Sequence, residues 1–486
     1  MPTPFLSTAL RTLRPVLPLR LRLPSGFDPT AYLAQHPDVR QAGGDPALHF
    51  LRYGRFERRH HRPLAALQDE YAVWAGNKDA LVRLERSAAG SDAEAAWARL
   101  ALARMAARFR DWPRAAALLD QPEQFATHLG LPDAGLLAME MALRLGDLQK
   151  ADALDEQLSR QFGALPELAF LNAYRALQTG NRAGWGQALQ RIFASERLVS
   201  PTLGQARGPD AFDSVQAQAT PLRLPETAPL VSIILPVRNA GHMIDTALEG
   251  LLAQSWHRIE VLVVVNGCTD DTEARVQAHA AKDARVQLLQ SPAARGAYGA
   301  RNLGAAKSQG TYLTVQDADD WSHPERIAQQ VARMTQGDTP AGCMVHWLRA
   351  TPDLCPAQCS VHPCMASLMI HRAVLDRLGP WDEVRAAADS EFLERLRHVH
   401  GQASVALVRP RAPLAFGRTL ARSLSHAPET GLLGEGAGAR TAYIRAARAW
   451  HVAAGTPVMP ASGQSPGPRP FPVPEALALP ESDATE

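Results

Sequence analysis

The stretch LVSIILPVRN, from Leu230 to Asn239, decides the fold, because it is an apolar, β-branched run that ends in polar residues. Such a run is typical of a buried parallel strand that leads into a loop. The next segment, MIDTALEGLLAQ at 243–254, has helical periodicity, and RIEVLVVVNGCTDDT at 258–272 is a second buried strand that enters a turn. After another helix comes the short strand RVQLLQS at 285–291. This β-α-β-α-β order predicts an open parallel sheet that binds ligands at the carboxyl ends of its strands.

Polar residues follow the first two predicted strands. Asn239 ends the first, and Asn266, Thr269 and Asp270 follow the second. An isolated Asn-Gly or Thr-Asp pair is typical of an ordinary turn. Because the carboxyl ends of parallel strands meet at one edge of the sheet, polar groups at several of them favour a nucleotide-binding crevice.

The fourth strand, TYLTVQ, ends at Gln316 and leads directly into three acidic residues, Asp317, Asp319 and Asp320. In extended backbone, Asp317 and Asp319 face one side and Asp320 faces the other. Carboxylates this close repel one another, and Mg²⁺ or Mn²⁺ held by them and by substrate phosphates would remove the repulsion. The alternative is a solvated acidic turn before the helix that starts after Pro324. The position at the end of a buried strand favours the metal site.

The segment before this strand, RGAYGARNLGAAK at 295–307, combines glycines with an arginine. Gly296, Gly299 and Gly304 allow close approach of the backbone. Arg301 can bind a phosphate or a carboxylate through both arms of its guanidinium group. The segment therefore predicts close approach of the backbone together with a cation for a phosphate or a carboxylate.

The run from Leu230 to Arg395 resembles glycosyltransferase family 2, whose members have the GT-A fold. The matching pieces, in the family's order and spacing, are VSIILPVRN, VVVNGCTDDT, ARNLG at 300–304, QDADDW at 316–321 and LGPWDEVRAAADSEFLERL at 378–396. The resemblance implies an α/β fold with a GT-A-type open, mostly parallel sheet flanked by helices. It also implies a nucleotide-diphosphate-sugar donor (UDP-linked is the expectation), a divalent cation, Mg²⁺ or Mn²⁺, and inversion at the anomeric carbon.

The resemblance also assigns a role to individual residues at the donor end of the site. Pro236, Arg238 and Asn239 would line the nucleotide pocket after the first strand. Asn266 and Asp270 would lie at the base and the ribose. These residues coincide with the polar strand ends found from the pattern alone.

At the reacting end, the resemblance places Arg301 near the diphosphate, Asp317 at the ribose or the metal, and Asp319 on the metal. Asp389 falls where the family has its general base, and Arg395 follows six residues later, as in the family pattern. A carboxylate within hydrogen-bond reach can take the proton of an acceptor hydroxyl as that hydroxyl attacks. One base opposite the leaving group is sufficient for a single inverting displacement.

Two departures from the family pattern affect the site. The second-strand turn has Val265-Asn266 where the family commonly has two Asp residues, so a charge is lost at the donor pocket. The base region has Ala388-Asp389 instead of Glu-Asp, which leaves Asp389 in the catalytic role and makes Glu391 a rival. The Q-x-x-R-W signature of processive synthases is missing after the base, so we expect a non-processive enzyme.

The rest of the chain divides by composition. Residues 27–63 resemble a short helical module found beside polysaccharide-related domains in bacterial proteins. Residues 66–198 are helical in pattern, with turn residues Asp111, Asp147 and Asn181 spaced by 36 and 34 residues, a period similar to that of tetratricopeptide-like hairpins. An irregular helical bundle is the alternative. The predicted organisation is a basic segment (1–26), the module (27–63), an all-α helical-repeat-like region (66–198), a linker (199–229), the glycosyltransferase-like domain (230–451) and a disordered Pro-rich tail (455–486).

Composition limits the cellular setting. The formal net charge of +2 does not call for nucleic acid, although residues 1–63 have ten Arg against four acidic residues, which is compatible with contact to an anionic membrane surface. Five Cys suggest free thiols in a reducing compartment. Four of them, with His346 and His362, lie in the window 343–364; a zinc site there is the alternative to free thiols. We expect a cytoplasmic protein, at most peripheral to the membrane.

Three functions remain open at this point. The first is a glycosyltransferase that acts on a surface glycan or a lipid-linked glycan. The second is a catalytically degenerate sugar-nucleotide-binding scaffold whose helical repeats recruit a protein partner. The third, a GT-A-like nucleotidyltransferase, requires a Gly-rich loop after the first strand, and PVRNAGHM at 236–243 is not such a loop. Retention of Asp317, Asp319 and Asp389 together favours the first.

Overall fold

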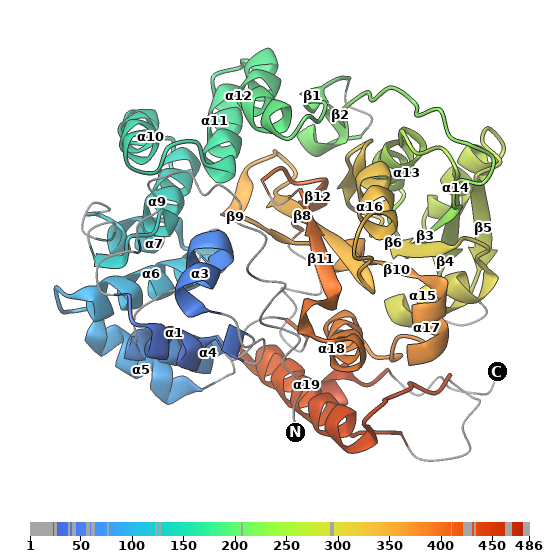
Figure 1. Ribbon diagram of the computed structural model, residues 1–486. Coiled ribbons are helices and arrows are strands. Elements are labelled where there is room, and N and C mark those ends of the chain that lie inside the picture. Colours follow the sequence, from blue (N-terminus) through green and yellow to red (C-terminus); the bar gives the residue numbers. More distant parts are fainter. Residues whose placement is uncertain are drawn as a thin grey trace.

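The computed structural model has a helical part and an α/β part that lie against each other (Figure 1). It describes residues 23, 27–36, 39–40, 45–54, 59, 64–74, 77–121, 125, 128–205, 208–291, 296–409, 411–420, 430–431, 434–461 and 469–479. The predicted basic segment 1–26 therefore lies almost entirely outside the described residues. No helix among the described residues is long and apolar enough to cross a membrane.

The helical part consists mainly of antiparallel helix pairs. Its helices are α1 (Pro29–Gln35), α3 (Pro46–His49), α4 (Ala65–Trp74), α5 (Lys78–Ser87), α6 (Ala93–Arg108), α7 (Trp112–Leu118), α9 (Asp133–Arg144), α10 (Leu148–Phe162), α11 (Pro166–Gln178) and α12 (Arg182–Ser195). Around α1 and α3, Tyr32, Val39 and Phe50 form a small separate core. The predicted all-α region is confirmed.

The three evenly spaced turn residues have the same structural task. The side chains of Asp111, Asp147 and Asn181 each accept a hydrogen bond from a backbone N–H three residues later and so begin α7, α10 and α12. A side-chain oxygen at this position satisfies one of the otherwise unpaired N–H groups of the first turn. The period in the sequence therefore marks the start of the second helix in three successive pairs.

The α/β part is built on a ten-stranded mixed sheet. Its strands are β3 (Val231–Val237), β4 (Ile259–Val265), β5 (Val286–Gln290), β6 (Tyr312–Val315), β7 (Trp321–Ser322), β8 (Gly342–Ala350), β9 (Pro356–Pro363), β10 (Met369–His371), β11 (Val405–Val408) and β12 (Ala415–Arg418). The order is β5-β4-β3-β6-β10-β8-β12-β7, and β9 and β11 also pair with β8. The four predicted strands are the parallel half, and antiparallel β10 joins them to the rest.

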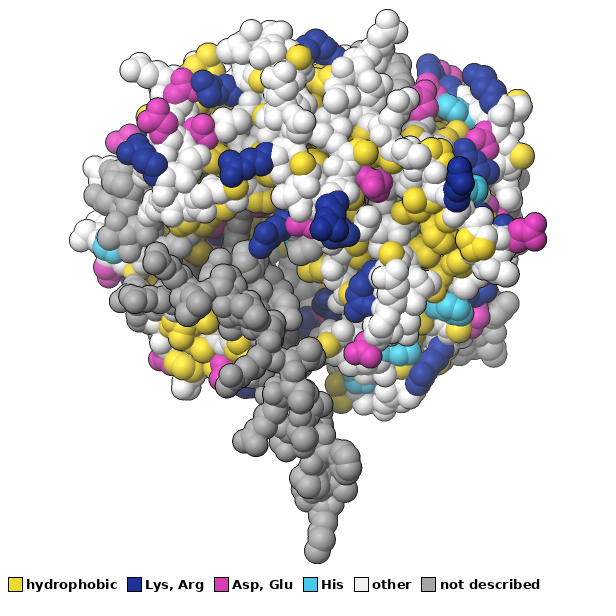
Figure 2. Space-filling model, turned by 45° about the horizontal axis from the view of Figure 1, so that its top comes forward, with side chains coloured by type: hydrophobic (Ala, Val, Ile, Leu, Met, Phe, Trp, Pro, Cys, Tyr) yellow, Lys and Arg dark blue, Asp and Glu magenta, His cyan; other side chains and the backbone are white. Residues whose placement is uncertain are grey.

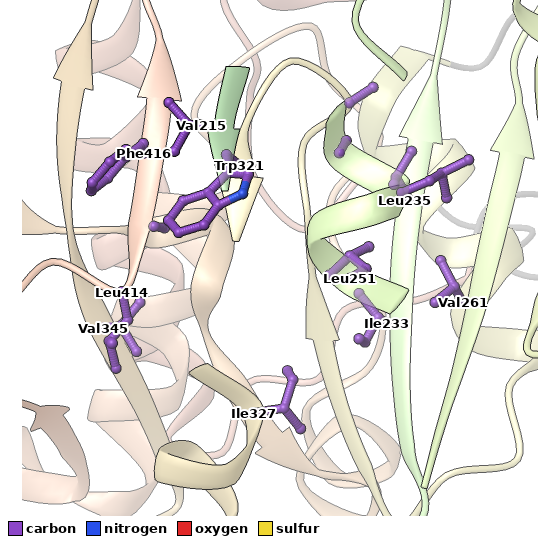
Figure 3. Packing of buried hydrophobic residues seen from close by; sticks show 14 of the residues in the cluster. Val215, Ile233, Leu235, Leu251, Val261, Trp321, Ile327, Val345, Leu414 and Phe416 are labelled. Atoms are coloured by element: carbon purple, nitrogen blue, oxygen red, sulfur yellow. The ribbon is translucent and has the colours of Figure 1, made fainter. Parts of the chain in front are cut away.

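Helices cover both faces of this sheet, because alternate residues of each buried strand point to opposite sides. The flanking helices are α13 (Ile244–Leu252), α14 (Thr272–Ala280), α15 (Gly296–Lys307), α16 (Arg326–Thr335), α17 (Arg372–Leu378), α18 (Ala388–His400) and α19 (Gly434–Ala454). Ile233 and Leu235 pack with α13 and α16, where Figure 3 shows Leu251 beside Ile233. Ile234 packs on the other face with α15, α18 and α19. The predicted fold class, an open α/β sheet flanked by helices, is confirmed.

Helix α15 lies unusually close to the sheet at Gly304. A Cβ atom added there would be 2.6 Å from Cγ2 of Ile234 and 3.2 Å from Cγ2 of Val264. Both neighbours are buried and β-branched, so they have little freedom to move. The glycine predicted to allow close approach does so at this position.

We expect Gly304→Leu to push α15 away from the sheet and to lower the free energy of unfolding by about 1–3 kcal/mol, the usual cost of overpacking a core. Thermal unfolding of the variant would measure this. Ala306→Leu, at an exposed position of the same helix, is the matched control and should unfold close to wild type. Equal stability of the two variants would contradict the packing described for Gly304.

The two parts of the molecule share cores. Phe170 of α11 and Trp185 of α12 contact Phe416 of β12, with ring centroids 5.5 and 6.3 Å apart. The hairpin formed by β8 and β9 reaches into the helical part, where Cys355 is buried among helical residues. Arg144 donates a hydrogen bond to the carbonyl of Pro356 (3.1 Å), 212 residues away in the sequence. The inner surface of the helices is therefore occupied by a segment of the same chain.

The two segments predicted as linker and tail contain buried residues. Between the helices and β3, Phe212 and Val215 are fully buried, and a two-stranded sheet forms from β1 (Thr202–Leu203) and β2 (Val215–Gln216). Disorder was predicted after residue 455, whereas the described part of that tail places Phe471 and Leu477 in the core with α18 and α19. Proline-rich composition indicated disorder, but a few apolar residues between the prolines are enough to pack against a preformed surface.

Candidate active site

The carboxyl ends of the parallel strands form a polar rim. Asn239, which follows β3 with a positive φ of 50°, accepts a hydrogen bond from the backbone N–H of Thr269 (2.8 Å). Asp270 accepts hydrogen bonds from the N–H of Gly241 (3.1 Å) and the hydroxyl of Thr272 (2.5 Å). Desolvation acts to raise the pKa of Asp270, but these hydrogen bonds lower it overall. The loop after β3 and the turn after β4 are thus held together.

The remaining predicted donor residues lie on the same rim. Pro236 is half-buried near the end of β3, and Arg238 directly after it is exposed. Asn266 is buried, and its backbone N–H donates to the carbonyl of Val237 (3.0 Å). The structure therefore brings the five residues assigned to the nucleotide pocket to one edge of the sheet.

Asp317 follows β6 next to this rim and pairs with Arg301 of α15. Their atoms Oδ1 and Nη2 are 3.0 Å apart, and Arg301 is buried while Asp317 keeps about a third of its side-chain surface exposed (35%). The guanidinium group also lies over the ring of Tyr298, 5.0 Å from its centroid. Burial acts to lower the pKa of Arg301, but the nearby carboxylates of Asp317 and Asp389 raise it overall. Arg301 thus keeps its charge at the centre of the site.

The next two carboxyl groups are crowded. Asp319 is half-buried, and burial together with the charge of Asp317 raises its pKa to about 6. Asp320 is buried, and desolvation and the charges of Asp319 and Asp317 raise its pKa well above the usual value. Carboxyl groups this close disfavour each other's ionisation. A bound divalent cation would remove the repulsion between the carboxylates and accept their oxygen atoms as ligands. The residues present therefore fit a Mg²⁺ or Mn²⁺ site at Asp317 and Asp319.

A buried glutamine braces the acidic turn. The side-chain amide of Gln316 donates to the carbonyl oxygen of Asp320 (3.1 Å), and its Oε1 accepts from Nη1 of Arg326 (2.8 Å). Arg326 is buried, which lowers its pKa to about 10. These hydrogen bonds hold the backbone of the acidic turn, which carries the carboxylates of Asp317, Asp319 and Asp320.

A second buried layer joins the turn to the segment before β3. The backbone N–H of Arg418 donates to Asp320 (3.1 Å), and its guanidinium group is paired with Asp210 (2.5 Å) and Asp213. Asp213 also accepts a hydrogen bond from the hydroxyl of Thr246 (2.8 Å). Sequence analysis missed these residues, because Asp210 and Asp213 lie in the predicted linker.

Asp389 lies in the first turn of α18, and its charge acts on Arg301. Its carboxylate is half-buried and accepts a bond from the backbone N–H of Ser390 (2.8 Å). Ala387, which precedes the helix, has a positive φ of 76°, a backbone conformation that costs a residue with a Cβ about 1–3 kcal/mol. Burial and the charge of Asp389 raise the pKa of Tyr298. Asp389, Tyr298, Arg301 and Asp317 therefore form one cluster.

Comparison with protein families gives a match in this region. The family model described as "Glycosyl transferase family 2" matches residues 232–349, which contain β3, β4, β6 and the acidic turn. The chain contains a family 2 glycosyltransferase domain.

Curated glycosyltransferases and a polysaccharide-biosynthesis protein are similar to part of this chain. An uncharacterized glycosyltransferase of Haemophilus influenzae is 36% identical over 108 residues, 22% of this chain and 43% of that protein. The Escherichia coli protein named UDP-Glc:alpha-D-GlcNAc-diphosphoundecaprenol beta-1,3-glucosyltransferase WfgD is 32% identical over 109 residues, 22% of this chain and 42% of that protein. The succinoglycan biosynthesis protein ExoO of Rhizobium meliloti is 34% identical over 108 residues, 22% of this chain and 30% of that protein. The chain thus spans less than half the length of these relatives.

Solved structures are also similar to this chain. S. aureus TarS 1-349 in complex with UDP has a TM-score of 0.34 and 16% identity, over 40% of this chain and 61% of that chain. The mannosyltransferase PcManGT from Pyrobaculum calidifontis, in complex with GDP-Man and Mn²⁺, has a TM-score of 0.33 and 18% identity, over 53% of this chain and 70% of that chain.

The side chain of Glu391, the alternative candidate for the general base, does not face the candidate site. Its side chain is fully buried, with Oε1 3.0 Å from Nε of Arg395 and 2.9 Å from Nε2 of His451. Arg395 also donates to the carbonyl oxygens of Leu378 and Pro380 (2.5 and 2.9 Å). Glu391 and Arg395 hold α18, α19 and the loop before α18 together, which leaves the half-buried Asp389 as the more accessible of the two carboxylates.

The described cysteines do not form a metal centre. Cys343, Cys355 and Cys364 are buried free thiols, and burial raises the pKa of Cys343 and of Cys364 to about 12. Among the residues that the structure describes, no group of three or more His, Cys, Asp or Glu side chains is arranged to hold a metal ion. The buried thiols are protonated and inert.

Proposed function

We propose that this chain is a metal-dependent, inverting, non-processive glycosyltransferase that transfers one sugar from a nucleotide-diphosphate sugar to a hydroxyl group of a glycan. One observation carries the proposal: Arg301, the pair Asp317 and Asp319, and Asp389 come from three separate stretches of sequence and meet beside the polar strand ends. An ordinary acidic turn would need neither Arg301 nor Asp389. The family 2 domain supports the same reaction class.

In this proposal each group has a separate task. Asp317 and Asp319 would hold Mg²⁺ or Mn²⁺, and the bound ion would neutralise charge on the departing diphosphate. Arg301 adds a fixed positive charge beside Asp317 (3.0 Å). Asp389 accepts the proton of the acceptor hydroxyl as it attacks the anomeric carbon. Since one carboxylate base is sufficient for a single displacement, inversion at the anomeric carbon is the simplest reaction for the site.

The names of relatives bear on the substrates. WfgD is named as an enzyme that uses UDP-Glc and acts on a diphosphoundecaprenol-linked sugar, as is WfaP, which is 31% identical over 102 residues. We therefore propose a UDP-linked donor and a lipid-linked or surface glycan as acceptor. The lack of the processive signature favours addition of one or a few sugars. A protein partner at the helical region receives no support, because the described inner helical surface is filled by the β8–β9 hairpin.

Binding of nucleotides tests this proposal directly. We expect UDP or a UDP-sugar with Mn²⁺ to raise the melting temperature of the wild type, and neither component alone to do so to the same extent, because ligands that bind only the folded state stabilise it. Asp319→Ala should lose the metal-dependent part of the shift. Asp338→Ala, at an exposed position of the same part of the chain, should keep it. If no nucleotide stabilises the wild type, the catalytic proposal is wrong and a scaffold role is favoured.

A further inference from the structure

Asp213 and Arg418 form an ion pair that is completely enclosed by the protein. Charged side chains ordinarily lie at the surface, as Figure 2 shows for many Lys, Arg, Asp and Glu residues on one face of the molecule. Removing two charges from water costs about as much free energy as their attraction returns, so well-packed apolar side chains often stabilise such a place equally well. The value of this pair therefore lies in its directional hydrogen bonds, which fix the groups that it connects.

Arg418 connects the pair to the acidic turn. Its backbone N–H donates to Oδ1 of Asp320 (3.1 Å), and its strand, β12, pairs with β7, which directly follows the acidic turn. The guanidinium group lies over the ring of Phe212, 4.4 Å from its centroid, and contacts the carboxylates of Asp210 (2.5 Å) and Asp213. Because the side chain is held at its far end, the backbone N–H that binds Asp320 is held as well.

Asp213 connects the pair to the loop after β3, which carries two of the residues assigned to the nucleotide pocket. Its Oδ1 accepts a hydrogen bond from the hydroxyl of Thr246 (2.8 Å), which is buried in the first turn of α13. The carbonyl oxygen of Ala240 in the loop accepts hydrogen bonds from the backbone N–H groups of Met243 and Ile244 (2.8 Å each). The loop and the start of α13 therefore form one hydrogen-bonded unit, and Asp213 binds that unit.

The segment that carries Asp213 contacts this loop a second time. A Cβ atom added at Gly208 would be 2.4 Å from Oδ2 of Asp213 and 3.2 Å from the carbonyl oxygen of His242. The backbone at Gly208 thus lies against both the buried carboxylate and the loop after β3. The family model matches residues 232–349, so these contacts come from outside the matched region.

We propose that Asp213 is a positioning residue of the active site, which acts through Arg418 and Thr246 to hold the acidic turn and the nucleotide loop in register. This inference rests on the proposed function and adds to its donor site a residue from outside the matched region. Mg²⁺ and Mn²⁺ are bound by carboxylates together with substrate phosphates. The two loops must therefore keep a fixed separation, and a site that is loosely supported loses affinity.

Binding of UDP with Mn²⁺, measured by calorimetry well below the melting temperature of each variant, tests the inference. Thr246→Val keeps the shape of the side chain and removes its hydrogen bond to Asp213, so it should weaken UDP binding roughly threefold to tenfold, the effect of one hydrogen bond. Thr246→Ser retains the hydroxyl group and should recover most of the affinity. Thr441→Val, at an exposed position of α19, is the matched control and should bind UDP like the wild type.

A second comparison separates positioning from stability. Arg418→Met should lower both the melting temperature and the affinity for UDP with Mn²⁺. The double variant Arg418→Met/Asp213→Leu removes both buried charges, so it should regain part of the melting temperature. Its affinity should stay roughly tenfold or more below wild type, because the directional contacts are still missing. Recovery of the affinity together with the melting temperature would show that the pair serves stability alone, and would overturn the inference.

Other outcomes distinguish this inference from the proposed function. A wild type and a Thr246→Val variant that bind UDP equally well would overturn the inference and leave the proposed function intact. A wild type that binds no UDP with Mn²⁺ would refute the proposed function. In that case titration of Mn²⁺ alone, followed by electron paramagnetic resonance, decides the inference: weaker binding in Thr246→Val supports it, and equal or absent binding overturns it.

Discussion

Asp389→Asn is expected to lower kcat by about 10²–10⁴-fold, the usual contribution of a general base. The amide has nearly the same shape as the carboxylate and can still accept the hydrogen bond from the N–H of Ser390 (2.8 Å), but it cannot take up a proton. Binding of UDP with Mn²⁺ should therefore stay close to wild type, since in the proposed function Asp389 serves the acceptor and not the donor. Steady-state kinetics combined with calorimetric titration of UDP would measure both quantities.

The same helix provides controls for this experiment. Glu394→Gln removes one partner of the solvent-exposed pair with Arg448 (66% exposed) and should leave kcat within about twofold, because exposed pairs contribute little. Glu391→Gln should instead lower the melting temperature, because Glu391 is fully buried between Arg395 and His451. An unchanged kcat for Asp389→Asn would remove Asp389 from the catalytic role. Loss of UDP binding in this variant would mean that Asp389 serves the donor.

Arg418→Met is expected to lower the free energy of unfolding by about 3–5 kcal/mol, because it leaves a buried carboxylate without its cation. Asp213 and Arg418 are both fully buried, and Asp213 would keep its hydrogen bonds from the hydroxyl of Thr246 (2.8 Å) and the backbone N–H of Asp210 (3.3 Å) but no cation from Arg418. Methionine has a similar length, so the effect reports on the lost charge more than on a cavity. Urea denaturation at neutral pH would measure the change.

Two further variants isolate the ionic contribution. Arg448→Met removes the cation of the exposed pair with Glu394 and should cost less than about 1 kcal/mol. The double variant Arg418→Met/Asp213→Leu removes both buried charges and should recover part of the stability lost by Arg418→Met alone. A loss for Arg418→Met no larger than for Arg448→Met would show that the buried pair does not support the acidic turn.

The sequence predicted those parts of the fold that depend on local pattern. The strands around 230–239, 258–265, 285–291 and 311–316 are apolar runs bounded by polar turns, and all four appear in the parallel half of the sheet. The polar residues at their carboxyl ends meet because parallel strands bring those ends to the same edge. The helix caps at Asp111, Asp147 and Asn181 are equally local. In each case a few residues that are neighbours in the sequence are enough to predict the strand or the helix cap.

Other features depend on residues that are distant in the sequence. Glu391 looked like a possible base until His451, 60 residues later, and Arg395 were found to enclose it. Arg418 follows no motif, and its backbone N–H reaches Asp320 from β12, which pairs in parallel with β8. Asp213 was hidden in a stretch with the composition of a linker. Burial of a charge against a partner from elsewhere in the chain leaves no local pattern to read.

The contacts between the β8–β9 hairpin and the helical part can form only late in the synthesis of the protein. Pro356 contacts Arg144 from 212 positions further along the chain, a distance that a ribosome covers in about 10–40 s at roughly 5–20 residues per second. During that interval the nascent helices present an apolar inner surface that the hairpin has yet to cover. Chaperone demand on the ribosome should therefore peak before residue 355 emerges and fall once the hairpin has inserted.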